Sequence, residues 1–236
     1  LIACGEYWRA TQDDAFLDQM MPVIKKIVFL LGAWEFNNRG LLYIPQTGDW
    51  ADEYLHHGYV LFDQLLYLQA KRSLQKIYSH VHESTDHRLN ESTSRLKHLI
   101  QANYWITDTD TIPDDVYHEV IYKKGIKASC RCNGNFWLPY FSPHGYGYRF
   151  DAFANVLASL FDVADESRRE KLDAYLENEI MHSKAIKLLP AFYPVITPID
   201  DDWQDLQTMF SYSFKNRPNE YHNGGLWPMI TGFYVA

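Results

Sequence analysis

The sequence predicts an all-α protein, and two observations support this fold class. Several segments carry apolar residues at the three- and four-residue spacing of one helix face, whereas alternation of apolar and polar residues is confined to short pieces such as 41–44. The 236 residues are 47% hydrophobic and 22% charged, which is typical of a folded globular protein with one large core. We therefore expect a single all-α domain over residues 1–236.

The clearest helix is the first, where Phe16, Met20 and Ile24 recur on one face. The segments expected to be helical are 13–31, 53–79, 91–102, 114–122, 150–163, 167–182 and 225–236. The connections at 32–52, 107–113, 125–148 and 188–224 are rich in Gly, Pro, Asn and aromatic residues. Long loops in compact domains usually carry function, so we expect the functional residues there.

Charge and composition narrow the possible functions. The net charge is −8 with acidic and basic residues scattered, which argues against nucleic-acid and membrane-surface binding. No apolar run is long enough to span a bilayer. Aromatic residues make up 16% of the chain and favour carbohydrate, because aromatic faces stack on sugar rings; an aromatic-rich core explains the number equally well.

Cysteines and termini add expectations about location. The three cysteines are an odd and sparse set, so neither a disulfide framework nor a zinc site at Cys130 and Cys132 is expected. A reducing compartment, the cytoplasm, fits better. The chain begins at Leu1 and stops at Ala236 inside an apolar helix, which predicts that both ends are truncated.

The first candidate block, residues 40–54, is rich in carboxylates. It holds Asp49, Asp52 and Glu53, and Asp63 follows shortly after. Cleavage of a glycosidic bond needs one carboxylic acid beside the leaving oxygen and a second carboxylate opposite. Trp50 could stack on a sugar and raise the pKa of a neighbouring carboxyl by desolvation. Alternatively, Asp49 or Asp52 caps the helix expected from residue 53.

Two further blocks place polar side chains beside glycines. In residues 219–228, His222 and Asn223 precede two glycines and an apolar helix; the alternative is a glycine-rich turn with an asparagine cap. Residues 142–151 hold His144, Arg149 and Asp151; here the alternative is a structural ion pair or a helix cap.

These blocks resemble the six-hairpin, (α/α)6 glycosidase superfamily, which includes amylo-α-1,6-glucosidases, trehalases and neutral/alkaline invertases. Segment 50–63, Trp-Ala-Asp and then Gly-Tyr-Val-Leu-Phe-Asp, resembles the superfamily's Trp-x-Asp…Gly-x-x-(Val/Ile)-Glu block. Segment 49–52 is also similar to the Asp-Trp-Asn-Asp block of cellobiose phosphorylases. Segment 221–228 resembles the Tyr-His-Asn-Gly-Gly-x-Trp-Pro block of neutral/alkaline invertases, and Arg149-Phe150 with Asn155 resembles another segment of that family.

Two positions depart from the invertase pattern. Asp52-Glu53-Tyr54 stands where that family has Asp-Arg-Arg, and Asp63 stands where a glutamate is usual. The resemblance therefore implies the fold more firmly than it implies invertase specificity.

The resemblance implies a partial (α/α)6 toroid, truncated at both ends, from an inverting glycoside hydrolase that needs no cofactor or metal. The implied substrate is a small α-glucoside or oligosaccharide, of the sucrose or α-1,6-branch type. Asp52 would be the general acid, and the base would lie outside this chain because no acidic residue follows Trp227. The implied substrate-binding residues are Asp49, Trp50, His144, Arg149, Tyr221, His222, Asn223 and Trp227.

Two alternatives remain open at this point. A disaccharide phosphorylase on the same toroid would need no base but would need an anion pocket, which the sequence does not clearly show. A non-catalytic sugar-binding toroid would keep the aromatics alone. Both hydrolase and phosphorylase readings predict that Asp52 and segment 221–225 line one cavity, with Asp52 within about 15 Å of His222. The oligomeric state is not predicted.

Overall fold

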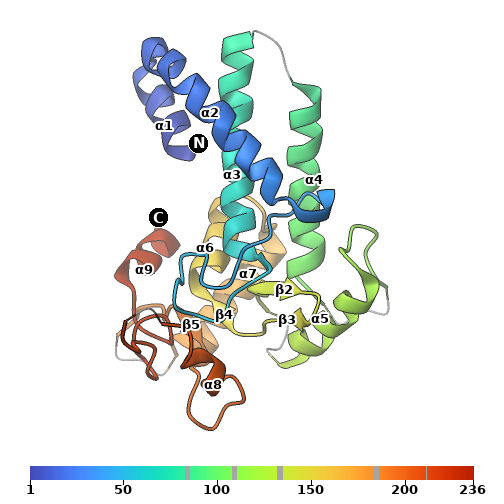
Figure 1. The fold of residues 1–236 in the computed structure, drawn as a ribbon. Helices are drawn as coiled ribbons and strands as arrows, with labels where there is room; N and C mark the ends of the chain where they lie inside the picture. The colour runs from blue at the N-terminus through green and yellow to red at the C-terminus, as the bar shows by residue number, and fades with distance from the viewer. Residues whose placement is uncertain (83–85, 108–110, 132–134, 183–185, 211) are drawn as a thin grey trace.

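The computed structural model describes residues 1–82, 86–107, 111–131, 135–182, 186–210 and 212–236 (Figure 1). Helices dominate, which confirms the all-α prediction. The helices are α1 (Ile2–Thr11), α2 (Asp14–Trp34), α3 (Leu61–His82), α4 (His87–Tyr104), α5 (Glu119–Arg131), α6 (Ala152–Leu160), α7 (Glu166–Tyr175), α8 (Trp203–Leu206) and α9 (Pro228–Val235), with a 3-10 turn η1 (Phe36–Asn38) and a π-helical turn η2 (Leu176–Ile180). The strands are β1 (Tyr59–Val60), β2 (Tyr140–Ser142), β3 (Gly145–Tyr146), β4 (Phe150–Asp151) and β5 (Phe192–Tyr193).

The long helices α2, α3 and α4 build the upper part of the molecule in Figure 1. Leu17 and Ile24 of α2 are buried against Leu74 and Ile77 of α3, because all four lie on the apolar stripes that the helical spacing predicts. The opposite side of α2 is not covered: Phe29 is 75% exposed.

The main core lies lower, where α3, α4 and α6 meet two small antiparallel sheets. Strand β2 pairs with β1 and β3, and β4 pairs with β5 through the Phe150–Tyr193 register. Trp137 and Phe141 are fully buried in this core. The strands are two or three residues long, so the sheets connect loops to the helices and do not form a separate layer.

Two bridges shape the loops that carry the candidate site. Ile44 and Gly58 exchange backbone hydrogen bonds of 2.7 and 2.8 Å, which closes segment 45–57 into a loop. Gly58 has φ +84°, and a Cβ there would lie 2.6 Å from the Phe141 carbonyl oxygen, so only glycine fits. A second bridge, Pro190 to Leu226, holds the ends of the long segment 190–226 together.

The structure corrects several predicted boundaries. The helix expected at 53–79 begins at Leu61, because residues 53–60 belong to the closed loop and to β1. The helix expected at 114–122 is instead α5, at Glu119–Arg131. Gly125 misled the prediction: it lies inside α5, where a Cβ would meet Ile106 Cδ1 at 2.3 Å, so it is small for packing and does not end the helix. Helices α1 and α8 were not predicted.

Candidate active site

Asp52 lies at the surface of the closed loop 45–57, in contact with the Tyr221–His222 segment. The Tyr221 hydroxyl donates a hydrogen bond of 2.9 Å to Asp52 Oδ1, and His222 Nε2 lies 3.4 Å from the same oxygen. The two blocks are thus adjacent although 170 positions separate them, as the sequence predicts. The Asp52 side chain is 61% exposed, so it stands at an open surface and not in an enclosed cavity.

His222 is held in place by aromatic rings. Its imidazole stacks on Trp227 with 5.5 Å between centroids and an angle of 8°, and the Trp50 ring meets it edge-on at 5.1 Å. Burial lowers the pKa of His222, so the ring is neutral near pH 7. A proton on Nε2 gives Asp52 a donor and leaves only a lone pair at Nδ1, which is buried without a partner among the described residues.

The loop around residues 216–224 is built by side-chain amides. Asn216 Oδ1 accepts hydrogen bonds from the His222 and Asn223 backbone N–H groups at 3.0 and 3.2 Å. The Asn223 amide donates to the carbonyls of Ile196 and Asn216 and accepts from the Ile196 N–H at 2.6 Å. Tyr221 adopts φ +46°, a strained value that these bonds maintain. Both donors of the Asn223 amide are therefore engaged within the protein.

Asp49 lies on the inner side of the same loop. Its side chain is fully buried, accepts a hydrogen bond of 2.9 Å from the Ala51 N–H, and lies 3.3 Å from His56 Nδ1. No helix begins near residue 53, so neither Asp49 nor Asp52 is a helix cap. Asp49 instead holds the turn that presents Trp50 and Asp52.

Asp151 is a second buried carboxyl beside Trp50. Its Oδ1 caps α6 by accepting from the Ala154 N–H at 3.0 Å, and its Oδ2 accepts from Trp50 Nε1 at 3.5 Å. Burial raises the pKa of Asp151 to about 6, with the nearby His56 opposing the rise. The cap reading of this residue is therefore correct, whereas Arg149 does not pair with it.

The remaining carboxyls of the first block point elsewhere. Glu53 is buried and pairs with Lys215 at 3.0 Å. Asp63 lies in the first turn of α3 and borders a cavity of about 340 Å³ between α1, α2 and α3. Burial, followed by the charges of Asp49 and Asp151, raises the pKa of Asp63 to about 8.

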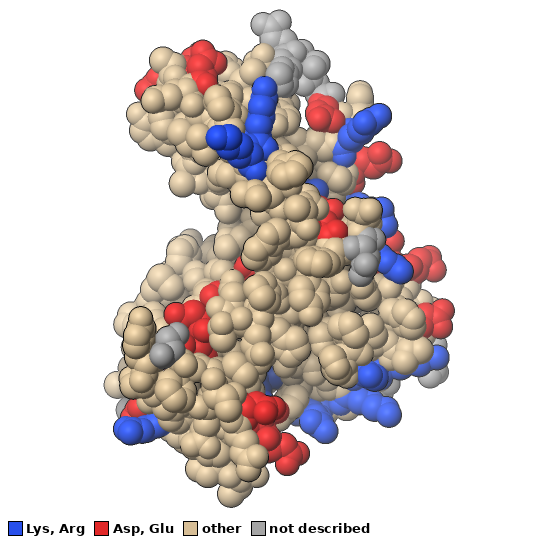
Figure 2. Space-filling view, in the orientation of Figure 1, with Lys and Arg blue, Asp and Glu red and all other residues tan. Residues whose placement is uncertain are grey.

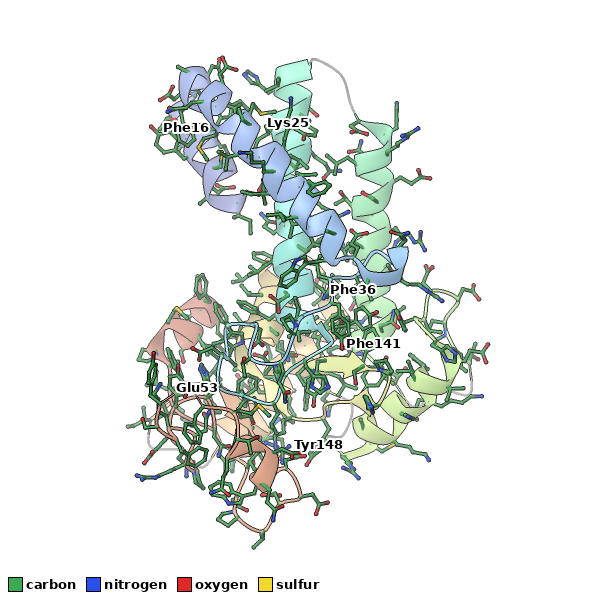
Figure 3. All side chains as sticks on the ribbon, viewed as in Figure 1. Phe16, Lys25, Phe36, Glu53, Phe141 and Tyr148 are labelled. Carbon is green, nitrogen blue, oxygen red and sulfur yellow. The ribbon has the colours of Figure 1, made fainter. Side chains whose placement is uncertain are left out.

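Arg149 and His144 are placed apart from Asp52. The Arg149 guanidinium pairs with Asp202 and lies 4.8 Å from the centroid of the Tyr148 ring. His144 is exposed at the turn between β2 and β3, where its carbonyl accepts from Lys124 of α5. Among the residues that the structure describes, no hydrogen bond, ion pair or ring contact joins either one to Asp52, Tyr221 or His222. In Figure 3, Glu53 and Tyr148 mark the two regions.

Trp50 has more contacts in the site than its sequence position indicated, and His56 and Asp202 were not predicted from the sequence. Trp50 is the hub of the site: its ring stacks on Phe192 at 5.4 Å and also meets the rings of Phe62, Phe153, His222 and Trp227. His56 was recognisable only by its position within the same loop as Asp49. Asp202 carried no sequence signal, because it is one of three consecutive aspartates at 200–202.

The described residues show few other features that could support chemistry. Within them, no group of three or more His, Cys, Asp or Glu side chains could hold a metal ion. Cys4 and Cys130 are free, and Cys132 lies outside the described residues. None of the described helices has the length and apolar character needed to cross a bilayer. Figure 2 shows acidic and basic side chains interspersed over one face of the molecule. A larger cavity of about 680 Å³, between α4 and α7, contains none of the predicted site residues.

The exposed Asp52 lies against Tyr221 and His222, beside the rings of Trp50 and Trp227, and the family that the chain matches is of the six-hairpin glycosidase type. Comparison with known families narrows that class. The chain matches the alkaline and neutral invertase family over residues 1–236 and belongs to it. Cytosolic invertase 1 of Oryza sativa subsp. japonica is 22% identical over 202 residues, which cover 76% of this chain and 34% of that relative. The match thus spans about a third of the length of the rice relative.

Proposed function

We propose that the protein is an inverting glycoside hydrolase that cleaves a small α-glucoside or oligosaccharide, such as sucrose or an α-1,6 branch, with Asp52 as general acid. The observation that carries this proposal is the contact of Asp52 with Tyr221 and His222. The two contacting segments are those that resemble the family's blocks, and they meet at an accessible surface. We also propose a cytoplasmic location, supported by the cytosolic relative, and a cofactor-free reaction.

The reaction involves two proton transfers, one to the leaving oxygen and one from the attacking water. Asp52 gives its proton to the leaving oxygen as the bond to the anomeric carbon breaks. A second carboxylate, which we place in a part of the protein outside residues 1–236, takes a proton from the attacking water on the opposite face. The two carboxyl groups would stand about 6.5–9.5 Å apart to leave room for that water.

Some neighbouring residues would contact the sugar, and others would position the residues that do. Tyr221 and Trp227 are partly exposed and offer aromatic surface to a sugar ring. His222 donates through Nε2 to Asp52 or to a sugar hydroxyl that displaces it. We propose that Asp49, which is fully buried, positions Trp50 and Asp52 instead of touching the substrate.

The test is an assay of the whole protein with sucrose and with an α-1,6-linked glucoside, followed by NMR of the anomeric proton. We expect hydrolysis that is independent of phosphate, with the first product released in the inverted configuration. Turnover that requires phosphate would make the protein a phosphorylase. Sugar binding without turnover would make it a non-catalytic toroid.

A further inference from the structure

His56 is a buried histidine near the end of loop 45–57, four positions after Asp52. Its side chain is 2% exposed, and its Nδ1 lies 3.3 Å from Oδ2 of Asp49, whose side chain is fully buried. Because a carboxylate only accepts hydrogen bonds, Nδ1 carries a proton and donates it to Asp49. The pair is therefore a hydrogen bond between two buried side chains of the same loop.

The two oxygens of Asp49 connect His56 to the residues around Asp52. Oδ2 accepts from His56, and Oδ1 accepts from the Ala51 N–H at 2.9 Å. Ala51 stands between Trp50 and Asp52 in the chain. A buried carboxylate oxygen is costly to leave unpaired, so loss of the His56 donor should make Asp49 seek another partner and release the turn at Ala51.

Aromatic packing fixes the orientation of the His56 ring. The ring centroid lies 4.7 Å from that of Phe192 and 5.0 Å from that of Tyr140. Phe192 also stacks on Trp50 at 5.4 Å, and Trp50 meets His222 edge-on at 5.1 Å. The aromatic contacts thus run without a break from His56, through Phe192 and Trp50, to His222.

The charges agree with this placement between the inner carboxyls and the outer histidine. Burial raises the pKa of Asp151, and a proton on His56 opposes that rise. Burial lowers the pKa of His222, the contact with Asp52 opposes that fall, and a proton on His56 adds to it. His56 is therefore close enough to act on groups at both sides of Trp50.

We propose that His56 is a positioning residue for Asp52: it holds Asp49, and Asp49 holds the turn that keeps Asp52 against Tyr221 and His222. His56 does not touch the substrate. The positioned group's role as general acid rests on the proposed function, whereas the link from His56 to Asp52 rests on the contacts alone. Precise placement matters because a shift of about 1 Å in a reacting group can cost about 10²-fold in rate.

The first experiment measures the pKa of His222 by NMR in the whole protein, with its signals assigned from their loss in His222→Gln. The variant is His56→Gln, whose amide ends near the position of Nε2 and leaves Oδ2 of Asp49 without its donor. If Asp52 moves away, the pKa of His222 should fall by about 0.5 or more, because the Asp52 contact raises it. Asp52→Asn gives the reference value for loss of the Asp52 charge.

The direction of the change separates positioning from a simple charge effect. Removing a charge on His56 alone would raise the pKa of His222, because that charge lowers it. A fall toward the Asp52→Asn value therefore supports the inference. A rise, or no change, in His56→Gln would overturn it.

Two variants are matched controls. His56→Asn places an amide N–H near the position of Nδ1, so the pKa of His222 should return to its original value or slightly above; a fall as large as that of His56→Gln would contradict the role of Nδ1. His57→Gln changes the neighbouring, half-buried histidine, which donates through Nδ1 to the Leu55 carbonyl at 3.1 Å. It should leave the pKa of His222 unchanged, and an equal fall would mean that any change in the loop has this effect.

A double-mutant cycle tests whether His56 acts through Asp49. In the whole protein, His56→Gln should raise KM for the sugar substrate about 3- to 30-fold, as expected for one lost hydrogen bond. In an Asp49→Ala background the same substitution should change KM by less than about twofold, because its partner is already gone. Equal effects in the two backgrounds would mean that His56 acts by packing and would overturn the inference.

Failure of this inference is distinguishable from failure of the proposed function, because the NMR measurement needs no substrate. Sugar hydrolysis by the whole protein, with the pKa of His222 unmoved in His56→Gln, would overturn the positioning role alone. A fall in that pKa in a protein that hydrolyses no sugar would keep the link from His56 to Asp52 and overturn the hydrolase.

Discussion

The carboxyl groups around Trp50 differ in their exposure to solvent, between an outer, accessible side and an inner, buried side. On the outer side, Asp52 is 61% exposed and is contacted by Tyr221 and His222. On the inner side, the side chains of Asp49 and Asp151 are buried and accept hydrogen bonds from backbone N–H groups. The outer carboxyl is accessible, whereas the inner pair is held within the fold, in line with the proposal that Asp52 meets the substrate and that Asp49 positions the loop. Adjacency in sequence therefore does not imply a shared role.

The largest expected effect is on the outer carboxyl. Asp52→Asn in the whole protein should lower kcat by about 10²–10⁴-fold, the usual contribution of a positioned general acid. A substrate with a good leaving group should be much less affected, because its departing oxygen hardly needs a proton. Steady-state kinetics on both substrates measures the difference.

Asp49→Asn is the matched control for that substitution. It should disturb the loop and raise KM without rescue by the good leaving group. If the rescue belongs to Asp49→Asn, the general acid lies on the buried side and the comparison is reversed.

The next effect is on stability and concerns the inner side. Asp151→Ala removes the cap of α6 and leaves Nε1 of the partly buried Trp50 without its acceptor, so the unfolding free energy should fall by about 2–4 kcal/mol in urea titrations. Asp165→Ala is the control: Asp165 caps α7 through the Arg168 N–H at 2.9 Å, but its side chain is 58% exposed. That variant should lose about 1 kcal/mol. Equal losses would mean that burial adds nothing to the role of Asp151.

The pH dependence of stability sharpens the comparison of buried with exposed carboxyls. The pKa of Asp63 is raised from 3.8 to about 8, so the folded protein binds a proton there that the unfolded chain releases, and stability should fall as pH rises through this window. Asp151, with its pKa near 6, acts the same way at lower pH. His222 has the opposite effect. Its pKa in the folded protein lies below 6.5, so the unfolded chain binds a proton more readily there and stability should fall as pH falls through 6.5.

Between pH 6.5 and 8, Asp63 is therefore the group of these three that titrates. The unfolding free energy should drop by about 2 kcal/mol across this range. Asp63→Asn should flatten the curve, since an amide needs no proton, while Asp52→Asn should leave it unchanged. A curve that stays steep in Asp63→Asn would contradict the assignment.

The smallest expected effect comes from Tyr221→Phe. It removes one hydrogen bond to an exposed carboxylate, so kcat should fall by about 2- to 10-fold. Burial and the Asp52 contact raise the pKa of Tyr221 to about 12, so the hydroxyl stays a donor at neutral pH and adds no limb to the pH–rate profile there. A loss above about 100-fold would place Tyr221 at the reacting atoms.

Helix prediction worked where the apolar spacing is strong and failed where packing decides. The stripe of α2 was readable because Leu17 and Ile24 repeat with the helical period and are buried. The start of α3 was not, because apolar residues before Leu61 belong to the closed loop, whose shape depends on Gly58 meeting Phe141. Gly125 shows the converse, a glycine required inside a helix by a distant neighbour.

The sequence alone determined the helical class, the family resemblance and the residues of the outer site, since these depend on local periodicity and on short blocks of residue types. Tertiary structure alone decided which carboxyls are buried, that the Asn223 amide braces two loops, and that Arg149 pairs with Asp202. Burial and the choice of partner are properties of segments far apart in the chain, so no local pattern records them. Solvent exposure distinguishes Asp49 from Asp52, three positions apart, and exposure exists only once the chain has folded.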